Sequence, residues 1–186
     1  MRLFVAMDLS ETVRAAVAQM CDRLRRAYPA ARWVRTEGMH ITLKFIGETS
    51  EDRMDTIREG LRNVHSSAPV EMVFRKLGFF PNERRPRVLW VGIEASPNLA
   101  EIALEIESRL EHFGIAKELR EFKPHLTLAR FNEPRGLDKL QAAIREAGEA
   151  NLGSMRTGEM YLYKSNLERG GAQYVKLETF PLAPMP

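Results

Sequence analysis

The sequence predicts one domain made of two related lobes, each built around a strand, a helix and a second strand. Three observations lead to this prediction. A length of 186 residues fits a single domain. Alternating or continuous apolar runs, typical of strands, are separated by segments with helical periodicity. One stretch of sequence also occurs twice. Two copies are too few for a repeat array, so we expect them to face each other across a pseudo-twofold axis, with a cleft between the lobes.

The first half begins with a short apolar run. Arg2 to Leu9 is expected to be a strand, and Ser10 can cap a helix that ends before Pro29. A second strand should run from His40 to Ile46. Another helix, starting near Ser50, should complete this half.

The rest of the chain shows a similar alternation of elements. The expected strands cover residues 70–77, 88–93, 125–131, 155–163 and 173–180, and the expected helices cover 96–113 and 137–147. A loop should lie between Phe79 and Pro86, and another, containing Gly170 and Gly171, should join the last two strands.

The repeat relates the two halves directly. Leu3-Phe-Val-Ala-Met-Asp corresponds to Leu89-Trp-Val-Gly-Ile-Glu, and each is followed, after a helix, by a strand that opens with His-x-Thr-Leu. The second strands read HITLKFIGE and HLTLARFNE. We therefore expect a single bilobal domain over residues 1–186, with halves at about 1–80 and 86–150 and with C-terminal strands in 154–182 completing the sheets.

Composition excludes several classes of protein. Hydrophobic residues make up 44% and charged residues 28%, as in soluble globular proteins. The single cysteine, Cys21, rules out an intrachain disulfide and a four-cysteine zinc site, and its helical apolar surroundings indicate a core residue. The N-terminal run lacks the features of a signal peptide, and no segment approaches the roughly 18 apolar residues of a membrane helix. We expect a cytoplasmic monomer that needs no membrane.

The duplicated His-x-Thr carries the candidate chemistry. Side chains two residues apart on a strand share a face, so His40 lies beside Thr42 and His125 beside Thr127. Imidazole titrates near neutral pH, so one histidine can accept a proton while the other donates one. Hydroxyls can hold the non-bridging oxygens of a phosphate. This set suits displacement at phosphorus.

The same motif argues against a metal or cofactor. Two histidines could bind zinc, but no third ligand is offered nearby, because threonine occupies each i+2 position. We therefore expect neither metal nor cofactor. His65 and His112 lie outside the repeat at expected helix ends, where a cation is favourable, and we assign them no catalytic role.

The motifs His40-Ile-Thr-Leu-Lys-Phe-Ile-Gly and Pro124-His-Leu-Thr-Leu-Ala-Arg resemble those of the two-histidine (2H) phosphoesterase superfamily. Within it, the chain is similar to the RNA 2′,3′-cyclic phosphodiesterases, also called 2′-5′ RNA ligases. The resemblance extends to the opening Arg2-Leu-Phe-Val-Ala and to the closing Gly171-Ala-Gln-Tyr. It implies a bilobal α+β fold with antiparallel-rich sheets around a central cleft.

The resemblance also implies an activity. It is the hydrolysis of an RNA 2′,3′-cyclic phosphate end, or of a small cyclic nucleotide, to a 2′-phosphomonoester. By analogy His40 is the proton donor and His125 the proton acceptor, although the sequence itself does not decide between the two roles. Reversible 2′-5′ RNA ligation is implied as a secondary activity.

Further substrate-binding residues follow from position in the strands. Lys44, four residues after His40, should share its face and could offset phosphate charge, or lie in solvent at the strand end. Arg130, five residues after His125, falls on the otherwise apolar face, so either the strand bends or Arg130 lies beyond its end; the resemblance favours a substrate-side role. Phe45 is the counterpart of Arg130 and is expected in the core.

Other side chains carry weaker expectations. Arg84, Arg85 and Arg87 are expected in a solvated surface run that could contact RNA phosphates. Trp33 and Trp90 are expected in the core, with Trp33 the better candidate for stacking on a base.

Two alternatives stay open from the sequence. The same site could act on small cyclic nucleotides, ADP-ribose cyclic phosphate or 2′-5′ oligonucleotides. The chain could instead be a non-catalytic RNA-binding module with a ferredoxin-like layout, which would expose aromatic side chains on a sheet.

Overall fold

The computed structural model describes residues 1–168 and 171–182. Within them the strands are β1 (Arg2–Asp8), β2 (Arg32–Trp33), β3 (His40–Glu48), β4 (Val70–Phe80), β5 (Val88–Ala95), β6 (His125–Arg130), β7 (Asn151–Thr157), β8 (Glu159–Glu168) and β9 (Gly171–Pro181). The helices are α1 (Glu11–Ala27), α2 (Met54–Arg62), α3 (Asn98–His112) and α4 (Asp138–Ala147), with short 3₁₀ turns at Thr36–Gly38 and Glu51–Arg53.

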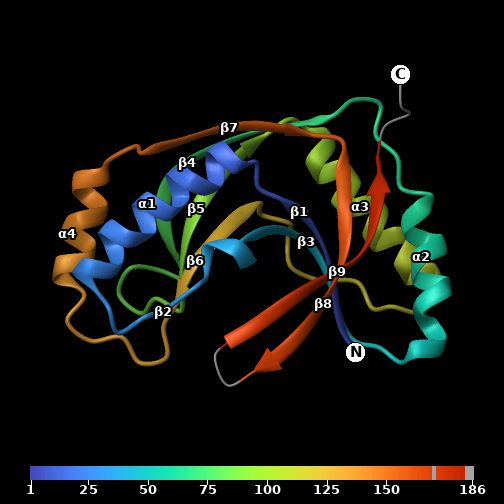
Figure 1. The fold of residues 1–186 in the computed structure, drawn as a ribbon, viewed down its shortest axis with the longest axis horizontal. Coiled ribbons are helices and arrows are strands. Elements are labelled where there is room, and N and C mark those ends of the chain that lie inside the picture. The colour runs from blue at the N-terminus through green and yellow to red at the C-terminus, as the bar shows by residue number, and fades with distance from the viewer. Residues whose placement is uncertain (169–170, 183–186) are drawn as a thin grey trace.

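Two antiparallel sheets form the centre of the molecule. One has the order β3-β1-β8-β9 and the other β2-β6-β5-β4-β7. Helices α1 and α4 lie on the side of the five-stranded sheet, and α2 and α3 on the side of the four-stranded sheet (Figure 1). The predicted two-lobed α+β architecture is confirmed.

The lobes exchange helices. Helix α1 follows β1 of the four-stranded sheet, yet it packs against β7 and α4 of the other lobe. Helix α3 follows β5 of the five-stranded sheet, yet it packs against β3 and α2. The sequence pattern of strand, helix and strand is present, but its helix covers the opposite sheet. Neither half can therefore bury its core alone.

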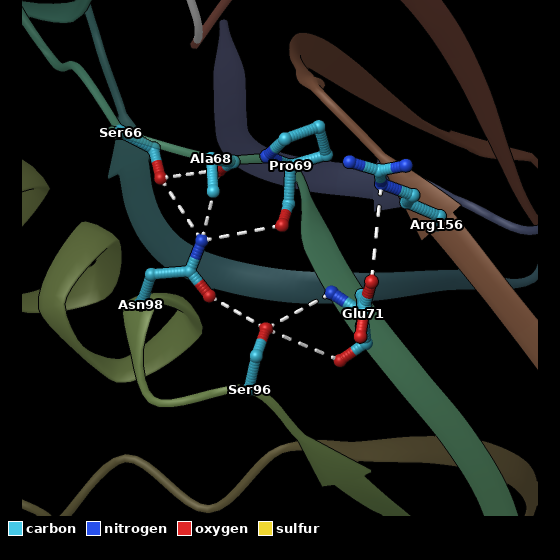
Figure 2. A network of polar contacts seen from close by, with 7 residues as sticks. All are labelled: Ser66, Ala68, Pro69, Glu71, Ser96, Asn98 and Arg156. Carbon is cyan, nitrogen blue, oxygen red and sulfur yellow. Dashed lines mark hydrogen bonds and ion pairs between the residues drawn. The ribbon is translucent and has the colours of Figure 1, made fainter.

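A polar network joins two segments that pass from one lobe to the other, one leading into β4 and one leading from β5 to α3 (Figure 2). The Asn98 side-chain amide, at the start of α3, donates to the Ser66 hydroxyl and to the Ala68 carbonyl, each at 2.9 Å. The Ser96 hydroxyl accepts from the Glu71 backbone amide at 2.9 Å. The segment entering β4 and the segment leaving β5 are thus fixed to each other, which holds α3 in place beside β3.

The core agrees with the apolar periodicity of the sequence. The Ser10 hydroxyl accepts from the Val13 amide at 3.3 Å, so it caps α1 as predicted. Cys21 is buried in the core, and burial raises the pKa of its thiol to about 12, which leaves it unreactive. No helix in the described ranges has both the length and the hydrophobicity that crossing a membrane requires.

The C-terminal region differs from expectation. The single strand predicted for residues 155–163 is wrong, because β7 and β8 divide at Gly158 and join different sheets. Strand β7 pairs with β4, whereas β8 pairs with β1. The alternation of apolar and polar residues is the same whichever sheet a strand joins, so it does not reveal a change of sheet. Of the loop expected at Gly170 and Gly171, Gly170 lies outside the described residues, and Gly171 begins β9.

Candidate active site

The two histidine strands carry the same irregularity at the same place. In the β1–β3 ladder Ala6 pairs with Thr42 and Val5 with Lys44, so the residue after Thr42 is an extra one. In the β5–β6 ladder Trp90 pairs with Thr127 and Leu89 with Ala129, which repeats the pattern. Such a bulge shifts the residues beyond it to the opposite face. The position three residues after each threonine therefore returns to the histidine face.

The bulge shows that the prediction for Lys44 is wrong. Its side chain points away from the histidine face, is almost completely buried, and donates to the Glu107 carboxylate at 2.5 Å and to the Ala116 carbonyl at 3.0 Å. A buried ammonium needs partners of this kind. Lys44 thus joins β3 to α3 and to the segment that leads into β6, and it does not face a substrate.

The same bulge explains Arg130 and overturns the prediction for Phe45. Arg130 is exposed and lies on the face of His125 and Thr127, although simple alternation assigned it to the apolar face. Phe45, expected in the core, is 59% exposed on the face of His40. The arginine forms no ion pair with a carboxylate in the described chain, so its charge is available at the site.

Each imidazole is held by a carbonyl two residues earlier. His40 Nδ1 lies 2.8 Å from the Gly38 carbonyl oxygen, and His125 Nδ1 lies 2.7 Å from that of Lys123. A carbonyl only accepts, so each Nδ1 carries the proton and each Nε2 is left for chemistry. The side chains of Thr42 and Thr127 are half-buried, and their hydroxyls bond no other residue that the structure describes.

His40 stands in an aromatic enclosure at the edge of a cavity. Its ring stacks on Phe4 with centroids 4.5 Å apart, and Tyr174 meets it edge-on at 4.9 Å. A methyl group at position 38 would lie only 3.2 Å from the Tyr174 ring, so Gly38 leaves room for this ring. The cavity, of about 510 Å³, is lined by Asp8, Arg14, Arg35, Glu37, Gly38, Met39, His40, Tyr163, Ala172, Gln173, Tyr174 and Lys176.

Burial lowers the pKa of His40 below the usual value for histidine. The hydrogen bond to Gly38 and the charge of Asp8 act in the opposite direction, and the charges of Arg130 and Arg14 add to the lowering. Arg130 belongs to β6 of the other lobe, so a charge from one lobe acts on the imidazole of the other. Strands β3 and β6 also contact each other where the lobes meet.

His125 has a different aromatic neighbour. The Phe80 ring meets it edge-on at 5.1 Å, and Phe80 lies 5.1 Å from Trp90. Trp90 pairs with Thr127, so it shares the histidine face and is only half-buried, contrary to the expected core position. Its ring covers Gly78, where any side chain would clash at 2.2 Å.

The remaining candidates lie farther from the two motifs. Trp33 is half-buried in β2 and donates its indole N–H to the Tyr28 carbonyl at 3.0 Å, which is a structural contact. Arg84 and Arg85 are exposed in the loop after Phe80, where their backbone amides donate to the Asn82 side chain at 3.0 Å. Within residues 1–168 and 171–182, no cluster of three His, Cys, Asp or Glu side chains could hold a metal ion.

Comparison of the chain with known proteins identifies its family. The model of a family described as LigT-like phosphoesterase matches the chain twice, over residues 7–90 and 91–174. A curated RNA 2′,3′-cyclic phosphodiesterase of Methanothermobacter thermautotrophicus is 35% identical over 97% of this chain and 98% of its own. The chain belongs to the LigT-like phosphoesterase family. The resemblance seen in the two His-x-Thr motifs is confirmed.

Solved structures agree with the assignment to the LigT-like phosphoesterase family. The protein TT0787 of Thermus thermophilus superposes with a TM-score of 0.81 at 30% identity, covering 98% of each chain. LigT of E. coli, in a complex with 3′-AMP, gives a TM-score of 0.75 at 26% identity over 97% of each chain. Membership of an enzyme family removes the alternative of a non-catalytic RNA-binding module.

Proposed function

We propose that this LigT-like phosphoesterase opens the 2′,3′-cyclic phosphate at the 3′ end of RNA and leaves a 2′-phosphomonoester. The observation that carries the proposal is the pair of matching histidine–threonine motifs, with both Nδ1 atoms fixed by carbonyls and both Nε2 atoms left for the substrate. The name of the Methanothermobacter relative supports this substrate class.

The proposed reaction needs one proton acceptor and one proton donor. His125, as a neutral imidazole, takes a proton from water while the water oxygen bonds to phosphorus. The bond from phosphorus to the ribose 3′ oxygen breaks, and His40, as the imidazolium, gives its proton to that oxygen. The next turnover requires the proton to pass from His125 to solvent and His40 to be protonated again.

The hydroxyls and the free cation would hold the phosphate. Thr42 and Thr127 lie beside the histidines, and their hydroxyls, which bond no other described residue, can donate to the non-bridging oxygens. Arg130 lies on the same face of β6 without a carboxylate partner in the described chain, and a guanidinium can bind two phosphate oxygens at once. Phe45, exposed at the equivalent position of β3, offers an apolar ring to the terminal nucleoside.

The proposal also covers cofactors, location, oligomeric state and a second activity. The two histidines supply both proton transfers, so we infer that no metal or cofactor is needed. We also propose that the protein acts in the cytoplasm as a monomer. Water and a ribose 5′-hydroxyl are chemically similar nucleophiles. Reversible 2′-5′ joining of RNA ends is therefore proposed as a secondary activity.

Product analysis tests the proposal. The purified protein is incubated in EDTA with an RNA that ends in a 2′,3′-cyclic phosphate, and we expect a 2′-phosphate end. No hydrolysis would contradict the activity, and a 3′-phosphate would contradict its direction. Values of kcat/KM for this RNA and for a nucleoside 2′,3′-cyclic phosphate then decide between RNA ends and small cyclic nucleotides.

A further inference from the structure

Asp8 faces His40 across the β1–β3 ladder. The two residues are direct partners in the register, and both line the cavity of about 510 Å³. Opposite residues of an antiparallel pair point to the same face, with Cβ atoms about 5 Å apart. The Asp8 carboxylate is therefore the cross-strand neighbour of the His40 imidazole.

The carboxylate is held without bonding the imidazole. The Tyr163 hydroxyl donates to one Asp8 oxygen, and the Lys176 ammonium lies 2.7 Å from the other. Lys176 is itself placed 3.6 Å from the centre of the Tyr161 ring. His40 Nδ1 is occupied by Gly38, so Asp8 can act on the imidazole only through its charge.

Several charged or titratable groups surround His40. They are Asp8 from β1, Arg14 from α1, Arg35 and Glu37 from the segment before β3, Arg130 from β6, Tyr163 from β8, and Tyr174 and Lys176 from β9. Among the side-chain charges that act on His40, those of Arg130 and Arg14 lower its pKa, whereas that of Asp8 raises it. Asp8 is thus the carboxylate that opposes the two arginines.

We propose that Asp8 is a positioning residue that keeps His40 in the protonation state its catalytic step requires, and that Lys176 limits this effect by pairing with Asp8. The proposal deepens the function proposed above and rests on it. Asp8 does not need to touch the substrate. Its removal should change the pH at which His40 works, and removal of Lys176 should have the opposite sign.

The test compares three variants of the full chain with the wild type. The rate constant kcat/KM for a nucleoside 2′,3′-cyclic phosphate is measured against pH for Asp8→Asn, Lys176→Met and Glu159→Gln. Glu159 is the matched control, since it accepts a hydrogen bond from Tyr161 at 2.7 Å in the same cluster but is not among the charges that act on His40.

Loss of the Asp8 charge destabilises the imidazolium, so the limb of the profile that belongs to His40 should move to lower pH and the other limb should stay. If His40 is the proton donor, the alkaline limb moves, and the ratio of variant to wild-type rate falls as pH rises. Lys176→Met should move the same limb to higher pH, and Glu159→Gln should move neither.

A second readout keeps the proposal independent of turnover. The His40 imidazole is titrated by NMR in the free protein, and its midpoint should fall in Asp8→Asn and rise in Lys176→Met. Unchanged midpoints, or shifts of the same sign in both variants, would overturn the role of Asp8 even if the enzyme is active. If the midpoints shift as expected but the wild-type protein hydrolyses no cyclic phosphate, the result would instead contradict the proposed function.

Discussion

Strands β3 and β6 begin with the same residues and differ after the bulge. Each presents a histidine whose Nδ1 is bound to a carbonyl two residues earlier, then a threonine, then the same bulge. Beyond the bulge, β3 carries Lys44 and Phe45, whereas β6 carries Ala129 and Arg130. After the bulge, β3 therefore has a buried cation and an exposed ring, and β6 has a buried methyl group and an exposed cation.

This difference divides the work between the lobes. The β3 side gives His40 an aromatic enclosure and a lowered pKa, while the β6 side supplies the free guanidinium of Arg130. We infer that the repeated motif supplies the two proton-transfer groups, and that the different residues after the bulge suit one side to the nucleoside and the other to the phosphate. The predictions below test this division, beginning with what the two strands share.

Loss of either shared histidine should have the largest effect. We expect His40→Ala and His125→Ala each to lower kcat by about 10²- to 10⁴-fold, the range for a general acid or base. Steady-state assays on a cyclic-phosphate RNA measure this. His65→Ala and His112→Ala serve as controls, since neither lies on β3 or β6. A loss below tenfold in either active-site variant would refute the paired role.

The buried Lys44 of β3 should matter for stability. Lys44→Met leaves Glu107 with a half-buried charge and no ammonium partner, so the free energy of unfolding should fall by about 3–5 kcal/mol. Urea denaturation measures the change. The double variant Lys44→Met with Glu107→Leu should recover much of the loss, and Lys139→Met on the exposed face of α4 should change little. No loss in the single variant would argue that the pair is not formed.

The exposed residues that follow the two bulges should differ in what they bind. Arg130→Ala removes a charge-assisted contact and should lower kcat/KM about 10- to 100-fold. Phe45→Ala removes a ring that can stack on a base and should weaken binding by about 1–3 kcal/mol. Assays with a substrate that lacks the base separate the two effects, because only the Phe45 effect should then disappear. A loss in Phe45→Ala that is equal with and without the base would contradict the proposed division.

The arginines after β4 should give the smallest effect. The double variant Arg84→Ala with Arg85→Ala should raise KM for an RNA oligonucleotide but leave a mononucleotide unaffected. Each lost phosphate contact should reduce the salt dependence of log K by about 0.7. Arg145→Ala, exposed on α4, is the control. An unchanged salt slope would place these side chains away from the RNA.

The sequence predicted what depends on local pattern and repetition. The histidine–threonine pairs, the helix that Ser10 caps and the apolar core all follow from spacing along the chain. The bulge did not, because register is a property of two strands and not of one. One extra residue moved Lys44 inward and Phe45 outward. The only signal was Arg130, an arginine placed by simple alternation on an apolar face.

Two larger features also lie beyond local pattern. The exchange of α1 and α3 between lobes depends on which sheet a helix packs against, and amphipathic periodicity does not specify its partner. The alternation of residues along the chain also does not reveal that the chain changes sheets at Gly158, between β7 and β8. Both features position the site, since α3 brings Glu107 to Lys44 and β8 brings Tyr163 to Asp8.

The most direct measurement is the pH dependence of kcat/KM for a cyclic-phosphate RNA in the wild type and in the two histidine variants. We expect a bell-shaped wild-type profile between about pH 5 and pH 9, with His125→Ala lacking the acid limb and His40→Ala the alkaline limb. A flat wild-type profile, or both limbs persisting in either variant, would contradict proton transfer by two histidines on matching strands.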